Sequence, residues 1–196
     1  MLRFKLKNIE IAMHFSFFAV IALLGLIQES SYMLLALIAC MLHESGHILL
    51  MCLFSVPPKK IDFYGAGIKI TPDNSKITST VQDFLILSGG SVTNIILFAV
   101  IYPMTKSSLN FSLFAVFNLI IGFFNLIPFK HFDGGKIIDL FLVTKKPEKS
   151  IAIRKIIRYI SVSLFVLFGV VLLLKKSSNI SLYFTICFII ISELFL

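Results

Sequence analysis

Two histidines and a glutamate in one short motif have the types and the spacing of a zinc site. The motif His43-Glu44-Ser45-Gly46-His47 lies inside an apolar stretch that runs from Tyr32 to Phe54. Residues four apart lie on one face of an α-helix, so both imidazoles can reach one metal ion. The intervening glutamate can then contact a metal-bound water. Ionisable side chains in the middle of a membrane-length segment are costly and are functional by default, so we predict a metal site here.

A catalytic zinc site needs a third protein ligand and an open fourth position, and the histidine motif supplies only two ligands. A second polar stretch, residues 125–136, contains a proline and a glycine pair within an otherwise apolar region. Irregular backbone at membrane depth is tolerated only where it is buried in protein or lines a polar cavity. Asp133 in this stretch has two interpretations at this point. It is either the N-cap of the amphipathic segment 136–143 or the third ligand.

The composition indicates an integral membrane protein. Of the 196 residues, 58% are hydrophobic and only 14% are charged, and the mean hydropathy of +0.97 is far above that of soluble domains. We therefore predict an all-α polytopic membrane protein with about six transmembrane helices and a small β-hairpin on the cytoplasmic side. The six apolar stretches cover residues 9–27, 33–54, 83–103, 109–127, 156–174 and 179–196.

The distribution of basic residues predicts the orientation in the membrane. With a cytoplasmic N-terminus, only Lys106, Lys175 and Lys176 of the 18 lysines and arginines fall on the opposite side. The positive-inside rule therefore places both termini of this multi-pass cell-membrane protein in the cytoplasm. This asymmetry accounts for the net charge of +8, and no folded basic domain that would bind nucleic acid is visible.

Two further stretches have alternative interpretations. Residues 61–70 are rich in β-branched and aromatic residues around Gly65 and Gly67, which predicts a hairpin of two short strands. This hairpin either rests on the membrane surface or offers a strand edge to an extended substrate. In the small-residue segment before Asn94, close helix packing is a sufficient explanation. Asn94 is also a candidate to support a metal ligand from behind.

The two polar motifs together resemble those of a known family. A His-Glu-x-x-His motif on an early membrane helix, followed by Asn-x-x-Pro-x-x-x-x-Asp-Gly-Gly, is similar to the site-2 protease family of intramembrane zinc metalloproteases, peptidase family M50. The spacing and the six-helix plan most resemble its stage IV sporulation protease FB branch. The resemblance covers essentially the whole chain, and it implies a single membrane-embedded metalloprotease domain over residues 1–196.

The resemblance also implies roles for individual residues. One zinc ion per chain would be held by His43, His47 and Asp133, with Glu44 as the catalytic base and Asn125 close to the site. Three features depart from the family pattern. The chain has room for neither a PDZ nor a CBS domain, and the proline that many relatives have after Gly89 is absent. Lys130 and His131 stand where relatives usually have apolar residues. His131 therefore stays open as a spare ligand or proton shuttle. The lone His14 is interpreted as a hydrogen-bonded or interfacial residue.

These observations favour a membrane-embedded zinc endopeptidase that cleaves a membrane-associated regulatory protein at or near the cytoplasmic leaflet. By resemblance, the substrate would be a sigma-factor precursor in sporulation. Two alternatives remain: a zinc-binding but inactive membrane scaffold, and a metal-ion transporter that uses the His and Asp residues as a transit site. The partners expected are the protein substrate, membrane-protein regulators and the lipid bilayer.

Overall fold

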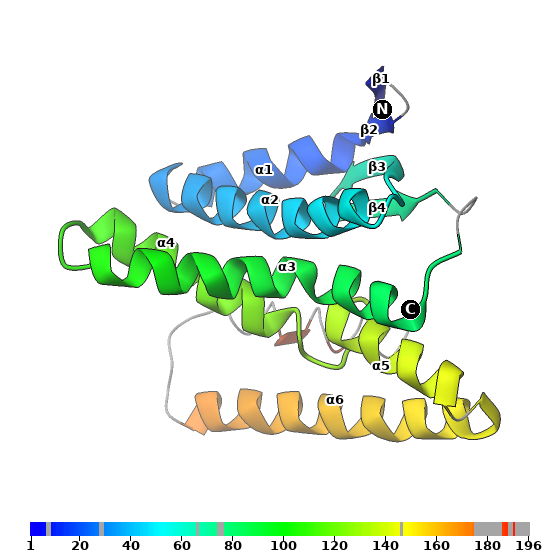
Figure 1. Ribbon diagram of the computed structural model, residues 1–196. Helices are drawn as coiled ribbons and strands as arrows, with labels where there is room; N and C mark the ends of the chain where they lie inside the picture. The colour runs from blue at the N-terminus through cyan, green and yellow to red at the C-terminus, as the bar shows by residue number, and fades with distance from the viewer. Residues whose placement is uncertain are drawn as a thin grey trace. The chain divides into compact units, whose positions relative to one another are not determined.

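The computed structural model describes residues 1–6, 9–27, 30–65, 67–73, 77–145, 147–174, 186–187 and 190. The chain divides into two compact units, Met1–Phe124 and Asn125–Leu196. Within the described residues, the first unit contains strands β1–β4 and helices α1–α4, and the second contains α5 and α6 (Figure 1).

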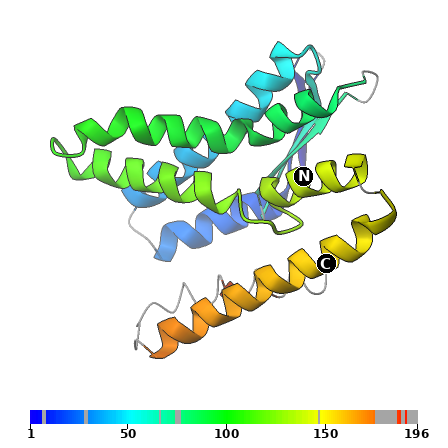
Figure 2. The ribbon, with the colours of Figure 1, turned by 60° about the horizontal axis from the view of Figure 1, so that its bottom comes forward.

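A four-stranded sheet lies at one end of helices α1 and α2 of the first unit (Figure 2). Its order is β1-β2-β3-β4, with antiparallel pairing inside the β1–β2 and β3–β4 hairpins and parallel pairing between β2 and β3. The predicted hairpin at 61–70 is confirmed as β3 and β4. The strands are β1 (Leu2–Leu6), β2 (Ile9–Met13), β3 (Pro58–Tyr64) and β4 (Gly67–Pro72).

The prediction of one helix over residues 9–27 is wrong in its first part. Residues Ile9–Met13 form β2, and α1 covers only Phe15–Ile27. Hydropathy over a short apolar run does not distinguish a strand from a helix, and here both flanking strands hydrogen-bond to β2. The fold is therefore not all-α with an isolated hairpin, because the predicted hairpin is half of a larger sheet.

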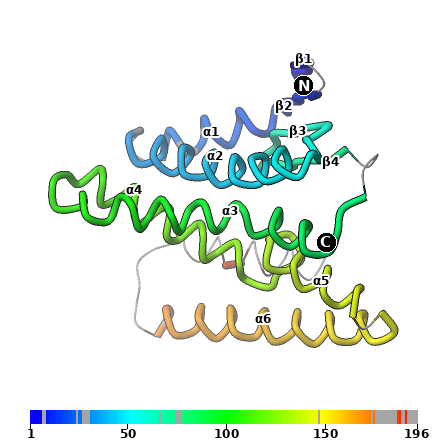
Figure 3. The backbone as a smooth tube through the Cα atoms, in the orientation of Figure 1, coloured from blue at the N-terminus to red at the C-terminus, as the bar shows by residue number. Residues whose placement is uncertain are grey.

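Helices α2 (Ser30–Leu53), α3 (Thr80–Ile101) and α4 (Leu109–Phe124) pack against one another and confirm the apolar segments predicted there. The short 3₁₀ turn Tyr102–Met104 lies between α3 and α4, which run side by side (Figure 3). A capping box begins α3: the Gln82 backbone N–H donates to Ser79 Oγ at 3.3 Å, and the Ser79 N–H donates to Gln82 Oε1 at 2.9 Å.

Glycines bring α2 and α3 into backbone contact. A Cβ atom added to Gly46 would lie 2.6 Å from the Gly89 carbonyl oxygen, and one added to Gly89 would lie 2.9 Å from the Gly46 carbonyl oxygen. Side chains larger than hydrogen would force the helices apart at this crossing, as in other membrane helix pairs with small residues at the interface. The motif that carries both histidines is thereby held directly against α3.

The second unit contains a loop followed by two helices, α5 (Asp133–Lys145) and α6 (Ser150–Leu174). The predicted segments 136–143 and 156–174 lie within these helices, which both begin earlier than expected. The 3₁₀ turn Pro147–Lys149 connects them, and Arg154 Nε lies 2.7 Å from Asp139 Oδ1 between the two helices. The sixth predicted segment, 179–196, lies almost entirely outside the described residues.

Three of the described helical segments are long and apolar enough to cross a membrane: Ser31–Leu53, Thr80–Met104 and Pro147–Leu172. The helix Leu109–Phe124 is apolar but shorter. These lengths match the roughly 20 residues that a helix needs to span the hydrocarbon core. The helices indicate a membrane protein, and six spanning helices remain a prediction.

Candidate metal centre

The two histidines of the motif lie one helical turn apart on the inner face of α2. Both are nearly buried, with 3% of His43 and 8% of His47 exposed. Their Nε2 atoms are 3.2 Å apart. The two rings therefore present one nitrogen each to a common point, as the four-residue spacing predicts.

Hydrogen bonds to the other ring nitrogens indicate which tautomer each histidine adopts. His43 Nδ1 lies 3.2 Å from Asn94 Oδ1, and His47 Nδ1 lies 2.7 Å from the Ile86 carbonyl oxygen. Both partners are acceptors, so each Nδ1 carries the proton and donates it. Each neutral ring then directs an Nε2 lone pair toward its neighbour. Two lone pairs at this separation suit a shared cation, and a hydrogen-bonded Nδ1 is the usual support of a metal-binding histidine.

A second asparagine, Asn118, holds the side-chain amide of Asn94 in its orientation. Asn94 Nδ2 donates to Asn118 Oδ1 at 3.2 Å and to the Ala39 carbonyl oxygen at 3.3 Å, which leaves Asn94 Oδ1 to accept from His43. Asn118, on α4, donates to the Phe114 carbonyl oxygen at 2.8 Å. Both asparagines are completely buried. The chain of hydrogen bonds thus connects three helices and orients the His43 ring.

Gly90 on α3 forms the wall beside the two imidazoles. A Cβ atom at this position would lie 2.5 Å from His43 Nε2 and would also overlap His47 Nε2. The space beside the paired nitrogens therefore exists only because residue 90 has no side chain. Two imidazole nitrogens facing such a space fit zinc, which takes nitrogen and carboxylate ligands in a tetrahedral site.

The remaining candidates of the first unit lie on α2 and on the sheet. Glu44 follows His43 on α2 and is partly buried. Gly65 and Gly67 border the β3–β4 turn: the Gly65 N–H donates to Ser16 Oγ of α1 at 3.1 Å, and Gly67 has a φ of 137° that favours glycine. These contacts give both glycines a structural reason to be there. His14 lies beside the sheet, with Nε2 3.8 Å from Asp62 Oδ1.

Asp133 is the first residue of α5 in the second unit. It is buried, with 5% of its surface exposed, and its Oδ1 lies 3.0 Å from Lys136 Nζ. The preceding loop folds back on the helix start: the Gly134 N–H donates to the Asn125 carbonyl oxygen at 2.8 Å. Added Cβ atoms at Gly134 and Gly135 would overlap loop carbonyl groups. The Asn-to-Gly-Gly motif is therefore a folded loop that fixes Asp133 in place, and His131 in that loop is exposed.

The sequence prediction missed Asn118, Gly90 and the Ile86 carbonyl group as parts of this centre. The sequence does contain a signal for Asn118, because it is a polar residue inside an apolar helix. Such residues are energetically costly in a membrane unless they have a hydrogen-bond partner. The Ile86 contribution comes from the backbone, which no side-chain pattern can reveal. Gly90 was interpreted only as a residue for helix packing.

Comparisons with known proteins agree with the motifs. The model of peptidase family M50 matches residues 104–168. Stage IV sporulation protein FB of Bacillus subtilis strain 168 is 29% identical over 136 residues, which cover 67% of this chain and 47% of that protein. The chain thus spans about half the length of this curated relative.

A solved structure extends the likeness to nearly the whole chain. The site-2 protease from Methanocaldococcus jannaschii matches with a TM-score of 0.68 and 27% identity, covering 98% of this chain and 94% of that one. The family model contains the Asp133 loop, and the structural match also takes in the histidine motif. Taken with the geometry of the paired histidines, these matches show that the chain is similar to the site-2 proteases and, over residues 104–168, to peptidase family M50.

Proposed function

We propose that this chain is an intramembrane zinc metalloendopeptidase. The single observation that carries the proposal is the pair of buried Nε2 atoms 3.2 Å apart, each on a ring whose Nδ1 faces an acceptor. A purely structural histidine pair has no need for two lone pairs at this distance. The adjacent Glu44 and the likeness to peptidase family M50 favour hydrolysis over transport or an inactive scaffold.

In this proposal His43, His47 and Asp133 hold the ion. When bound, zinc activates a water molecule and polarises the carbonyl of the scissile peptide. Glu44 accepts the proton of the attacking water and delivers it to the leaving amine. The buried asparagine pair keeps the His43 ring in the tautomer whose Nε2 carries the lone pair that binds the ion. Both histidines are buried, which limits the access of bulk solvent to them.

We further propose that the substrate is a membrane-associated regulatory protein cut at or near the cytoplasmic leaflet. A peptide bond inside a helix has its carbonyl engaged, so the substrate must be extended or locally unwound. Strand β4 is the last strand of the described sheet and has one neighbour there, β3. Its outer edge offers backbone groups for pairing with an extended segment. The likeness to a stage IV sporulation protein favours a sigma-factor precursor as the substrate.

Removal of Asp133 tests the three-ligand site. We expect the purified protein in detergent to contain about one zinc per chain, and Asp133→Ala to lose most of it, because two histidines alone make an incomplete site. Elemental analysis after dialysis against a weak chelator measures the ratio. Asp139→Ala, on the same helix and engaged with Arg154, is the matched control and should retain zinc. Full zinc in the Asp133 variant would show that the third ligand is elsewhere, with His131 the next residue to test.

Removal of the Asn94 side chain, which accepts the hydrogen bond from His43 Nδ1, tests the role of the asparagine pair. We expect Asn94→Ala to weaken zinc binding about 10-fold to 100-fold, the usual cost of losing a hydrogen-bond partner of a metal-binding histidine. Competition with a chelator of known affinity measures the dissociation constant. Asn110→Ala, at an exposed position on α4, is the control. Unchanged affinity in a folded Asn94 variant would contradict the assigned role.

A further inference from the structure

The β1–β2 hairpin has two chemically different faces. Side chains alternate along a strand, and residues paired across strands share a face. Arg3 pairs with Ala12, and Lys5 pairs with Glu10, so these four side chains lie together. The opposite face is entirely apolar in both strands and consists of Leu2, Phe4, Leu6, Ile9, Ile11 and Met13.

The apolar face of β1 is exposed. Leu2, Phe4 and Leu6 have 62%, 48% and 61% of their surfaces accessible. An edge strand with a continuous exposed apolar row would promote aggregation in water, and soluble proteins avoid it. An apolar medium must therefore cover these side chains.

The position of the hairpin identifies that medium. Only His14 separates β2 from the apolar helix α1, and only four residues separate the end of α2 from β3. The rings of Phe17 on α1 and Phe63 on β3 stack edge to face, with centroids 5.3 Å apart. The sheet is thus attached to the apolar helix α1 and to the end of α2, a candidate membrane span, which is where a bilayer surface is expected. Acyl chains are the apolar medium within reach.

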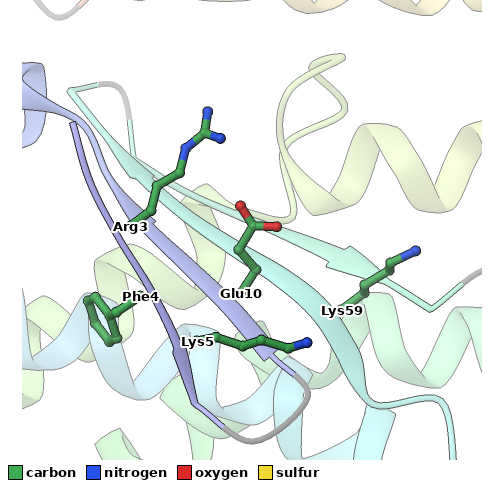
Figure 4. A pocket seen from close by; sticks show the side chains of 5 residues that line it. All are labelled: Arg3, Phe4, Lys5, Glu10 and Lys59. Atoms are coloured by element: carbon green, nitrogen blue, oxygen red, sulfur yellow. The ribbon is translucent and has the colours of Figure 1, made fainter.

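Three cations surround a shallow depression on the hairpin. Its lining is Arg3, Phe4, Lys5, Glu10 and Lys59. Figure 4 shows the Arg3 and Glu10 side chains rising from neighbouring strands and the Phe4 ring projecting away from Arg3. Among the ion pairs of the described residues, none involves Arg3, Lys5 or Lys59. Unpaired cations beside an apolar row match the headgroup region of an anionic membrane.

We propose that the β1–β2 hairpin is an interfacial lipid-binding surface. Leu2, Phe4 and Leu6 enter the acyl region of the adjacent leaflet. The long side chains of Arg3 and Lys5 on β1 and of Lys59 on β3, which line one depression, bind the phosphate groups of anionic phospholipids. This surface is separate from the metal centre and does not depend on the proposed proteolysis.

A depth measurement tests the apolar part. A fluorophore would be attached to Phe4→Cys in the full chain with Cys40, Cys52 and Cys187 replaced by alanine, in nanodiscs of phosphatidylcholine with about a quarter phosphatidylglycerol. We expect quenching by a lipid labelled on the part of its acyl chain next to the headgroup and protection from aqueous iodide. Lys69→Cys is the matched control, because Lys69 is exposed and shares the face of Arg3 through Asp62 and Ala12. Equal iodide quenching at both positions would overturn the proposal.

A lipid-selectivity measurement tests the basic part. Spin-labelled phosphatidylglycerol and phosphatidylcholine would be compared for association with the full chain in the same nanodiscs. Each cation near the surface contributes up to about fivefold, so we expect Arg3→Gln/Lys5→Gln/Lys59→Gln to lose most of the preference for the anionic lipid. Lys145→Gln/Lys149→Gln/Lys155→Gln removes the same charge from exposed positions of the second unit and should keep it. Equal loss in both variants would mean a general charge effect and would refute the site.

Discussion

Glu44→Gln is expected to abolish peptide hydrolysis while zinc remains bound. Glutamine has nearly the shape of glutamate, but it cannot accept a proton from the attacking water. Loss of a general base typically costs about 10²-fold to 10⁴-fold in rate. His43 and His47 keep the hydrogen bonds of their Nδ1 atoms in this variant, since the acceptors are Asn94 Oδ1 and the Ile86 carbonyl oxygen and not Glu44. The measurement is the first-order cleavage rate of a membrane-tethered sigma-factor precursor, reconstituted with each variant.

The zinc content of the same samples separates the two roles that Glu44 could have. Retained zinc with lost cleavage supports a base. Lost zinc would make Glu44 a ligand, which would remove it from the proposed proton transfer. Cleavage at the wild-type rate would refute the proposed mechanism. Ser45→Ala is a suitable control, because Ser45 is exposed and its hydroxyl group donates to the Leu42 carbonyl of its own helix.

Gly90→Ala is expected to destroy the metal centre without unfolding the protein. The added methyl group would overlap both Nε2 atoms, and the imidazoles are side-chain ends that can rotate away. Rotation relieves the overlap but breaks the geometry that places two lone pairs together. We expect the zinc dissociation constant to rise by at least about 100-fold, the upper end of what disturbed ligand orientation costs. The cleavage rate should fall as zinc binding is lost.

A glycine in a roomier place provides the control for this substitution. A Cβ atom at Gly25 on α1 would lie 3.7 Å from the Met33 side chain, an ordinary contact distance. Gly25→Ala should therefore leave zinc binding and cleavage unchanged. Thermal unfolding of the zinc-free proteins shows whether Gly90→Ala is still folded. A folded Gly90 variant with normal zinc affinity would show that the metal lies away from this wall of the centre.

The histidine motif could be read from the sequence because its geometry is local. Four residues span one helical turn, so the meeting of His43 and His47 follows from the helix itself. Asn118 is 75 positions away from His43 and reaches it only through Asn94, so its part depends on how α2, α3 and α4 pack. The role of Asp133 as a ligand remains a prediction from the motif and the family. Its place at the start of α5 agrees with the interpretation of Asp133 as the residue that begins the amphipathic segment, whereas the folding of the preceding loop was predicted only as a break in the helix.

The difference between local patterns and long-range packing also explains which helices and strands could be predicted from the sequence. Helices α2, α3 and α4 each come from one long apolar run, and length decides in favour of helix. The run from Ile9 is mostly apolar, and its composition does not reveal the change from strand to helix at His14. The alternation of apolar and basic residues in Leu2–Leu6 has the period of a strand. The parallel pairing of β2 with β3 brings together segments about 50 residues apart, which no local pattern specifies.

The glycine crossing between α2 and α3 also restricts how a substrate can approach. With the Gly46 and Gly89 backbones in contact, a peptide coming sideways from the lipid cannot pass between these helices unless they separate. The gap between α3 and α4 is closed in the same way, because a Cβ atom at Gly122 would already lie 3.2 Å from the Ser91 carbonyl oxygen. Within the described part of the first unit, we therefore expect lateral access to the histidines on the side of α1 and the sheet. A crosslink between α2 and α3 should then leave access to the histidines intact.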